Sequence, residues 1–222
     1  METVIELKNV SKHFKNKVLL EHVTLSIQRG QVIGFVGSNG AGKSVLFKLI
    51  SGIYTPDSGR VMVNGRKLGQ GQDFPDNVGI LIDSPGLIER YSGTDNLRFL
   101  AGIKNNVGDK EIEEAMELVG LSYNDKKPVK KYSLGMKQKL GIAQAIMENQ
   151  DILLLDEPFN SLDYATCNEI RAIVQQMKES EKTVLLTSHH HSDLEKLCDK
   201  IYLIRNNTIE TFTDQLKKQY FK

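Results

Sequence analysis

The chain has 222 residues, of which 40% are hydrophobic, 7% aromatic and 26% charged, and its 29 basic and 28 acidic side chains give a formal charge of +1. This composition excludes an intrinsically disordered chain, which needs low hydrophobicity and high net charge, and a collagen-like chain, which needs far more than 18 glycines and 5 prolines. No apolar run reaches the ~18 residues of a membrane span, and the N-terminus lacks the apolar region of a secretory signal. We therefore expect a soluble, cytoplasmic protein without nucleic acid as a partner, because a near-neutral charge attracts none at long range.

A chain of this length permits one large domain or two small ones, and it can bury enough surface to fold without a disulfide or a structural metal. Its two cysteines, Cys167 and Cys198, have neither a CxxC spacing nor a histidine at the distance of a zinc ligand. We expect ordinary reduced thiols at both positions.

Short runs of branched apolar residues alternate with helical patterns along the chain, which favours an α/β fold. The expected strands are Val4–Leu7, Val32–Val36, Val61–Val63, Val78–Ile82, Ile152–Asp156, Thr183–Thr187 and Ile201–Ile204. Between Asp83 and Gln150 the strand pattern is absent, and two helical patterns take its place, Asp109–Gly120 and Gly135–Asn149. We therefore expect a helical insertion within an α/β core.

The first inserted helix carries capping residues at both ends. Asp109 can cap its start, and Gly120 can end it. A later apolar stripe predicts a further helix between two strands; it consists of Ile170, Ile173, Val174 and Met177.

The strand Val32–Val36 runs directly into a glycine-rich loop and a helical pattern that begins at Val45. The loop reads Gly37, Ser38, Asn39, Gly40, Ala41, Gly42, Lys43 and Ser44. Glycines let successive N–H groups point inward, and the helix N-terminus adds partial positive charge, so the loop can cradle the β- and γ-phosphates of a nucleotide. Lys43 supplies a full cation, and the Ser44 hydroxyl can ligate Mg²⁺. A chance glycine turn beside a surface lysine is the weaker alternative.

A second motif supplies the carboxylates that such a site needs. Ile152–Leu155 fits a strand buried on both faces, so Asp156 and Glu157 emerge at its carboxyl end, where parallel sheets place their ligands. We expect Asp156 to hold Mg²⁺ directly or through water, and Glu157 to act as the general base on the attacking water. Alone, two acids after an apolar strand would more often be a solvated strand end.

With these motifs in place, the chain resembles the ATP-binding subunit of an ABC transporter from Leu7 to Ile204. The most specific segment is Tyr132–Leu140, which is similar to the ABC signature motif. The resemblance implies a P-loop NTPase (RecA-like) α/β core with antiparallel β elements and an inserted α-helical subdomain. It implies a single ABC ATPase domain over residues 1–222, with residues 1–82 and 151–222 as the nucleotide-binding core and residues 83–150 as the helical subdomain.

The resemblance also implies roles for smaller segments. In the signature motif, Ser133, Gly135 and Met136 would contact the ATP held by a second copy. Ser161, Leu162 and Asp163 look like the D-loop, which lies across the dimer interface. His189 looks like the switch histidine, so Lys43, Glu157 and His189 are the expected catalytic residues. Phe14 stands where the family has an aromatic residue that stacks on adenine, although an ordinary core or strand aromatic is nearly as compatible with the sequence.

The chain departs from the family pattern at several positions. Asp83 replaces a frequent glutamine, and Leu134 and Met136 replace a glycine and a glutamine of the signature. Because Asp83 keeps an oxygen for Mg²⁺ or its water shell, the expected metal ligands are Ser44, Asp83 and Asp156. This variant looks most like bacterial exporters of peptide antibiotics and drugs, including bacitracin and lantibiotic immunity systems.

By resemblance, two copies pack head to tail around two ATP molecules with Mg²⁺, or one copy pairs with a homologous ATPase subunit. The transmembrane permease subunits would be separate polypeptides, and this chain would lie peripherally on the cytoplasmic face of the cell membrane. Two alternatives stay open. One is a soluble, non-transport ABC ATPase in DNA repair or translation, and the other is a weakly hydrolysing, nucleotide-dependent regulatory module.

Overall fold

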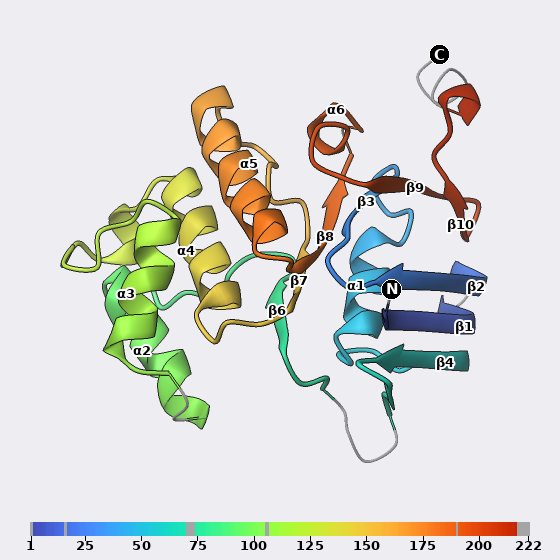
Figure 1. The fold of residues 1–222 in the computed structure, drawn as a ribbon, viewed down its shortest axis with the longest axis horizontal. Helices are drawn as coiled ribbons and strands as arrows, with labels where there is room; N and C mark the ends of the chain where they lie inside the picture. The colour runs from blue at the N-terminus through green and yellow to red at the C-terminus, as the bar shows by residue number, and fades with distance from the viewer. Residues whose placement is uncertain (1, 16, 70–73, 105–106, 190, 217–222) are drawn as a thin grey trace.

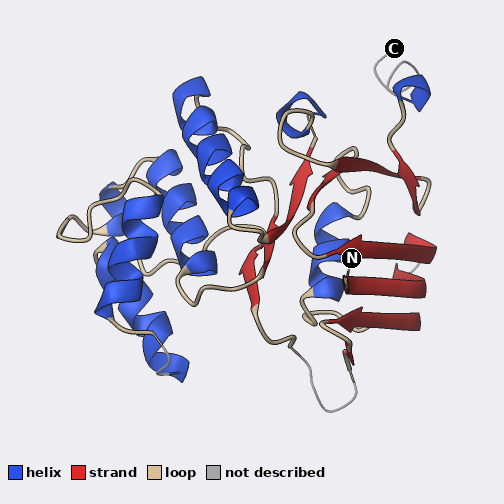
Figure 2. Ribbon diagram, in the orientation of Figure 1, coloured by secondary structure: helices blue, strands red, loops and turns tan. Residues whose placement is uncertain are grey.

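Two β-sheets organise the chain in the computed structural model, which describes residues 2–15, 17–69, 74–104, 107–189 and 191–216 (Figures 1 and 2). One sheet is antiparallel, with strand order β2-β1-β4-β5. Its strands are β1 (Thr3–Phe14), β2 (Lys17–Gln28), β4 (Ser58–Val63) and β5 (Arg66–Lys67). The other sheet has order β10-β9-β3-β8-β7-β6 and is parallel except for the pair formed by β9 and β10. Its strands are β3 (Val32–Val36), β6 (Val78–Leu81), β7 (Ile152–Leu155), β8 (Thr183–Ser188), β9 (Lys200–Arg205) and β10 (Thr208–Thr211).

The central strands β3, β7 and β8 are buried on both faces, which explains their nearly continuous apolar sequences. Because successive side chains point to opposite faces, Ile33 and Phe35 enter one core cluster while Val32 and Val36 enter another. The first cluster includes the apolar side of helix α1 (Lys43–Ile50) and residues of β1, β2 and β4. Helix α1 is therefore packed between the two sheets.

Helices cover the other face of the parallel sheet. Helix α5 (Tyr164–Glu179) contacts β8, and the short helix α6 (His191–Leu194) contacts the same strand. Helices α2 (Gly93–Lys104), α3 (Asp109–Leu118) and α4 (Leu134–Ile146) pack against one another at the left of Figure 1. A 3₁₀ turn at Val129–Lys131 precedes α4. All of these segments share a core cluster with alternate residues of the central strands.

The predicted strands are all found, although β1 continues seven residues beyond its predicted end at Leu7, and three strands, β2, β5 and β10, were missed. Strand β2 alternates buried and exposed residues because one face of its antiparallel sheet meets solvent, which weakens its apolar signal. Both helices predicted between Asp83 and Gln150 are found, as α3 and α4, but helix α2 in the same region was missed. Helix α2 contains Gly93 and Gly102, and glycine has low helix propensity.

The capping of α3 was predicted correctly only at its end. Gly120 has φ +67°, and the N–H of Leu121 donates to the carbonyl of Met116 at 2.8 Å, which terminates the helix. At the start, Gly108 is the cap residue, and Asp109 instead accepts hydrogen bonds from Arg98.

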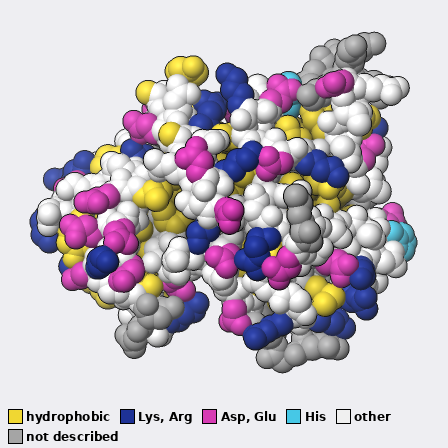
Figure 3. Space-filling model, in the orientation of Figure 1, with side chains coloured by type: hydrophobic (Ala, Val, Ile, Leu, Met, Phe, Trp, Pro, Cys, Tyr) yellow, Lys and Arg dark blue, Asp and Glu magenta, His cyan; other side chains and the backbone are white. Residues whose placement is uncertain are grey.

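The surface and the cysteines agree with the composition. Figure 3 shows acidic and basic side chains interspersed over the face in view. Both cysteines are free. Among the described residues, no helix combines the length and the apolar run that crossing a bilayer requires.

Helix α4 lies close against strand β6 because Gly79 has no side chain. A Cβ atom at Gly79 would overlap the carbonyl oxygen of Ala145 and would lie 2.8 Å from a methyl group of Leu153. The contact between the helical region and the edge of the parallel sheet therefore depends on a missing side chain.

We predict that Gly79→Ala lowers the free energy of unfolding by about 1–3 kcal/mol, because α4 must move away from β6. Urea unfolding followed by circular dichroism measures this change. Gly102→Ala is the matched control, since a Cβ atom there meets nothing within 4 Å. Because alanine favours an exposed helix, that control should gain up to about 1 kcal/mol. Equal stability of the two variants would contradict the role given to Gly79.

Candidate functional site

Parallel pairing brings three chemically important segments to one edge of the sheet. Val36 of β3 pairs with Ser188 of β8, and Leu155 of β7 pairs with Leu186 of β8. The residues that follow these strands are therefore neighbours at the carboxyl edge, where open α/β sheets bind ligands. They are the glycine-rich loop, the acidic pair after β7 and the histidine after β8.

The loop adopts a shape that only glycine allows at two of its positions. Gly42 caps α1 with φ +111°, a backbone conformation that L side chains rarely adopt. A Cβ atom at Gly37 would lie 2.7 Å from the carbonyl oxygen of Ile204 on the neighbouring strand β9. The loop backbone at Gly37 therefore passes close to strand β9, and helix α1 begins at Lys43.

The side chain of Lys43 curls back over this loop and is only 6% exposed. Its Nζ donates to the carbonyl oxygens of Gly37 at 2.7 Å and of Ser38 at 3.4 Å. The ammonium group therefore lies at the start of α1, where the helix dipole also favours an anion.

A cavity of about 300 Å³ opens above the loop. The described residues that line it are Lys17, Leu19, Asn39, Gly40, Gly42, Lys43, Ser44, Val45 and Glu157. Backbone N–H groups at a helix start and a lysine ammonium suit phosphate oxygens, and a serine hydroxyl with a nearby carboxylate suits Mg²⁺. The donor set thus fits a nucleotide phosphate with its divalent cation.

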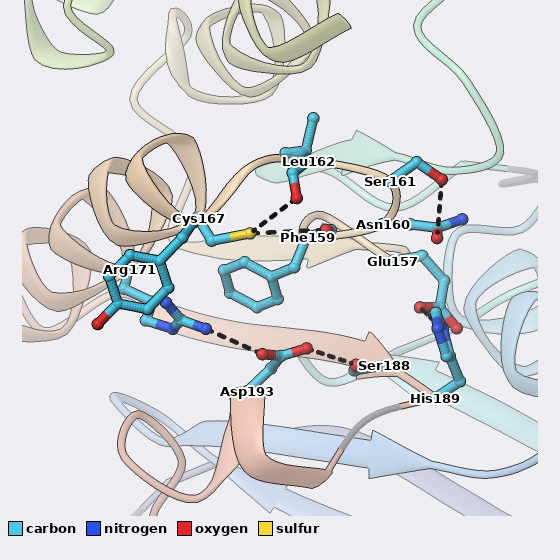
Figure 4. A pocket seen from close by; sticks show the side chains of 11 residues that line it. Glu157, Phe159, Asn160, Ser161, Leu162, Cys167, Arg171, Ser188, His189 and Asp193 are labelled. Carbon is cyan, nitrogen blue, oxygen red and sulfur yellow. Dashed lines mark hydrogen bonds and ion pairs between the residues drawn. The ribbon is translucent and has the colours of Figure 1, made fainter.

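The three residues predicted to be catalytic form one chain of contacts. The Nζ of Lys43 lies 3.1 Å from Oε1 of Glu157, and Nδ1 of His189 lies 3.0 Å from Oε2 of the same carboxylate. Figure 4 shows the Glu157 and His189 side chains pointing toward each other. Glu157 has φ +48°, so its backbone adopts a conformation that is uncommon for a residue with a side chain. Its carboxylate is therefore fixed between the loop and the end of β8.

Asp156 is buried and is anchored by two neighbouring strands. Its N–H donates to the carbonyl of Leu81 at 2.7 Å, and its Oδ1 accepts a hydrogen bond from the Thr187 hydroxyl at 2.5 Å. The same hydroxyl oxygen accepts the N–H of Glu157 at 2.7 Å. The sequence predicts Thr187 only as the last residue of a strand. A hydroxyl that follows three buried apolar residues, Val184, Leu185 and Leu186, is nevertheless a signal for a buried polar contact.

Asp83, a predicted metal ligand, contacts a lysine of α1. Its Oδ2 lies 2.7 Å from Nζ of Lys48, and this hydrogen bond raises the pKa of Lys48 above its usual value. Lys48 also lies over the ring of Tyr54, with Nζ 5.7 Å from the centroid. Lys48 was missed in the sequence, where a lysine in a helix is an ordinary surface residue. The role of Asp83 in binding metal stays a prediction.

Phe14, the predicted adenine platform, is 38% exposed at the end of β1. Its ring centroid lies 5.1 Å from that of Tyr54, and Nζ of Lys12 lies 5.2 Å from the Phe14 centroid. Phe14 is not among the described residues that line the loop cavity, so its contact with a base stays a prediction.

The signature residues lie at the start of α4, away from the loop cavity. Ser133 caps the helix by accepting the N–H of Met136 at 3.2 Å. Gly135 faces α5, and a Cβ atom there would lie 2.7 Å from the methyl group of Thr166. Neither Ser133 nor Gly135 is among the described residues that line the cavity above the loop. The structure thus brings together the loop, the acids and His189, but it does not bring the signature to them within one chain.

The predicted D-loop borders a second cavity of about 350 Å³, which Figure 4 shows from close by. Ser161 and Leu162 line this cavity together with Glu157 and His189. Asp163 caps α5 by accepting the N–H of Thr166 at 2.9 Å, and this hydrogen bond holds the pKa of Asp163 below its usual value. The predicted D-loop is therefore adjacent to two of the side chains predicted to be catalytic, Glu157 and His189.

The ion pair between Arg171 and Asp193 closes the other side of this second cavity. Nη2 of Arg171, on α5, lies 2.9 Å from Oδ1 of Asp193, on α6. Oδ2 of Asp193 accepts a hydrogen bond from the Ser188 hydroxyl at 3.3 Å, so the pair ties α5 to the end of β8, just before His189 (Figure 4).

The chain is similar to several known proteins. A family model described as ABC transporter matches residues 20–160. The uncharacterized ABC transporter ATP-binding protein YybJ of Bacillus subtilis (strain 168) is 37% identical, over 94% of this chain and 95% of its own length. The bacitracin transport ATP-binding protein BcrA of Enterococcus faecalis is 36% identical, over 90% of this chain and 66% of its own length.

Two further matches cover most of both chains. The lantibiotic transport ATP-binding protein SrtF of Streptococcus pyogenes is 34% identical, over 93% of this chain and 89% of its own length. A solved structure of the ATP-binding subunit of an ABC transporter is 27% identical, covers 99% of this chain and 94% of its own, and has a TM-score of 0.83.

Proposed function

Because the chain belongs to the ABC transporter family as an ATP-binding and ATP-hydrolysing subunit, we propose that it powers the export of a drug or an antimicrobial peptide. The predicted family and the P-loop NTPase fold class are both confirmed. The export of this cargo class rests on relatives whose names specify bacitracin transport and lantibiotic transport. The alternative of a non-transport ABC ATPase in DNA repair or translation has no such support.

The observation that carries the proposed mechanism is the contact chain of Lys43, Glu157 and His189 beside the loop. Lys43 and the N–H groups of the loop bind the β- and γ-phosphates and neutralise their charge. The Glu157 carboxylate orients the attacking water and accepts its proton at Oε1 or Oε2. His189 holds this carboxylate in place and lies where it can donate a hydrogen bond to the γ-phosphate.

The residues suited to hold Mg²⁺ are Ser44 and Asp156, with Asp83 as a further candidate through water. When bound, Mg²⁺ neutralises charge on the transferred phosphate and orients it. The buried Asp156 carboxylate supplies a hard oxygen ligand at the strand end, and its anchoring by two strands limits its movement.

Two copies would complete the site. Since the exposed Ser133 and the buried Gly135 lie at the start of a helix outside the cavity, this helix N-terminus would contact a γ-phosphate held by another subunit. Gly135 packs toward Thr166 of α5, and an exposed apolar or aromatic residue begins each of the two helices: Leu134 begins α4, and Tyr164, which is 80% exposed, begins α5. We propose that this surface packs against the phosphate loop of a second copy, or of a homologous ATPase subunit, in a head-to-tail arrangement.

The segment after β6 is suited to contact separate membrane subunits. The Asn96 side chain accepts the N–H of Ile88 at 2.6 Å and donates to the carbonyl of Ser92 at 2.8 Å, which fixes this segment to α2. The exposed Phe99 stacks near Tyr91, with ring centroids 4.9 Å apart. We propose that this aromatic surface receives a short apolar helix of a transmembrane permease subunit, which would hold the chain on the cytoplasmic face of the membrane.

We predict that Lys43→Ala weakens ATP binding about 10- to 100-fold, because it removes a charge-assisted contact to phosphate. Isothermal titration calorimetry with a non-hydrolysable ATP analogue measures the affinity. Lys110→Ala removes an exposed lysine of α3 and should leave it unchanged. An unaltered affinity in Lys43→Ala would contradict the role of the loop.

We predict that Glu157→Gln lowers ATP turnover at least about 100-fold and traps an ATP-bound dimer, because the amide cannot accept the proton of water. Light scattering with ATP and Mg²⁺ should then report a doubled mass, and Glu114→Gln on α3 should behave like the wild type. If the wild type and Glu157→Gln hydrolyse ATP equally slowly, the catalytic assignment is wrong, and the regulatory-module alternative gains support.

We predict that Phe99→Asp prevents co-purification with a membrane subunit, because a desolvated carboxylate would face the partner's apolar helix. Nucleotide affinity should stay at the wild-type value. Affinity purification from membranes of the native cell, followed by sequencing of the co-purified chains, measures the association. Leu118→Asp, at another exposed apolar residue, is the matched control and should retain the partner. Retention by Phe99→Asp would exclude this surface as the contact.

A further inference from the structure

We propose that Thr187 is a positioning residue for ATP hydrolysis, because its single hydroxyl sets the geometry of both carboxylates of the site. This inference rests on the proposed roles of Asp156 and Glu157. Thr187 is the penultimate residue of β8 and is fully buried. Its Oγ1 lies 2.5 Å from Oδ1 of Asp156 and 2.7 Å from the backbone nitrogen of Glu157.

The direction of both hydrogen bonds follows from the donors present. A backbone N–H can only donate, so the Thr187 oxygen accepts from Glu157. The one hydroxyl proton is then directed to Asp156, whose ionised carboxylate can only accept. This order fixes the rotation of the hydroxyl and ties Asp156 through Oδ1, which leaves Oδ2 as the oxygen that would be available to a divalent cation.

The second hydrogen bond supports an uncommon backbone. Glu157 has φ +48°, and such a conformation persists in a non-glycine residue when surrounding contacts hold it. The N–H contact with Thr187 is one such contact, and it lies on the same residue whose carboxylate meets Lys43 and His189. Without the hydroxyl, the peptide between the two acids can rotate, and both carboxylates leave their positions.

A purely structural role for Thr187 makes different predictions. Valine keeps the branched shape and the methyl packing but lacks the hydroxyl, whereas serine keeps the hydroxyl and loses the buried methyl group. If Thr187 only packs, serine is the more damaging change. If it positions the acids, valine is the more damaging change for turnover, although serine costs more packing.

The strand itself offers a matched control. Thr183 lies on β8 at the end away from the acids, is buried, and accepts the N–H of Gly30 through its hydroxyl at 3.0 Å. Thr183→Val therefore also removes a buried hydroxyl that pairs with a backbone N–H, but it leaves the carboxylates alone.

The test compares the full-length wild type with Thr187→Val, Thr187→Ser and Thr183→Val. For each protein we measure kcat and KM for ATP and the midpoint of urea unfolding. We also measure the dissociation constant of ADP in EDTA and in Mg²⁺, and we take the ratio of the two constants. For Thr187→Val we expect kcat to fall about 10- to 100-fold and the Mg²⁺-dependent gain in ADP affinity to shrink by a similar factor. The ADP affinity in EDTA should stay within about twofold of wild type, because the loop is intact. Thr187→Ser and Thr183→Val should keep kcat and the Mg²⁺ ratio within about twofold.

Wild-type kcat and Mg²⁺ ratio in Thr187→Val would overturn the inference, as would an equal loss in Thr187→Ser. Should Thr187→Val fail to fold, Thr187→Cys, whose thiol is a much weaker donor, must show the same losses. The variants Asp156→Asn and Glu157→Gln distinguish a failure of the proposed function from a failure of the role given to Thr187. If both keep wild-type turnover, the proposed function itself fails; if both lose turnover while Thr187→Val does not, only the role of Thr187 fails.

Discussion

The parallel pairing of β3, β8 and β7 is the constraint on which the rest of the site depends. These strands are buried on both faces, and their register brings the ends that carry the loop, the acids and the histidine to one edge. A slip of one residue would turn every side chain of a strand to the opposite face, so the two core clusters specify the register strongly. Packing of apolar residues thus determines where Lys43, Glu157 and His189 meet.

The charges at this edge are arranged so that none is buried alone. Lys43 is nearly buried, and an unpaired ammonium there would be costly, but it contacts Glu157 and the carbonyl of Gly37 together. One cation therefore fixes the acid relative to the loop. The Asp156 carboxylate is also buried, and its Oδ1 accepts a hydrogen bond from the Thr187 hydroxyl on β8, while its backbone N–H donates to Leu81 on β6. The polar groups at the site are linked to the fold at each point, which limits their freedom before any ligand arrives.

Local signals explain which parts of this arrangement were predictable from the sequence. The loop, the acidic pair and the central strands are contiguous patterns, so the α/β fold and the residues that follow β3, β7 and β8 could be identified directly. The partners of Thr187 and Lys48 could not be identified, because they are 31 and 35 positions away, and only the strand order and helix packing bring each pair together. Strand β2 and helix α2 were missed because a solvated face and two glycines dilute their patterns. The predicted contact of the signature with a second copy would involve contacts that one chain does not contain.

The link between the loop and the helical region follows from the same contacts. Lys48 lies on α1, the helix that follows the glycine-rich loop. Its partner Asp83 lies at the start of the segment that the Asn96 side chain holds against α2. Asp83 has φ +62°, so the backbone changes direction there and depends on contacts to keep its path. In this chain, an aspartate at that position joins the helix that follows the glycine-rich loop to the segment before α2 through an ion pair.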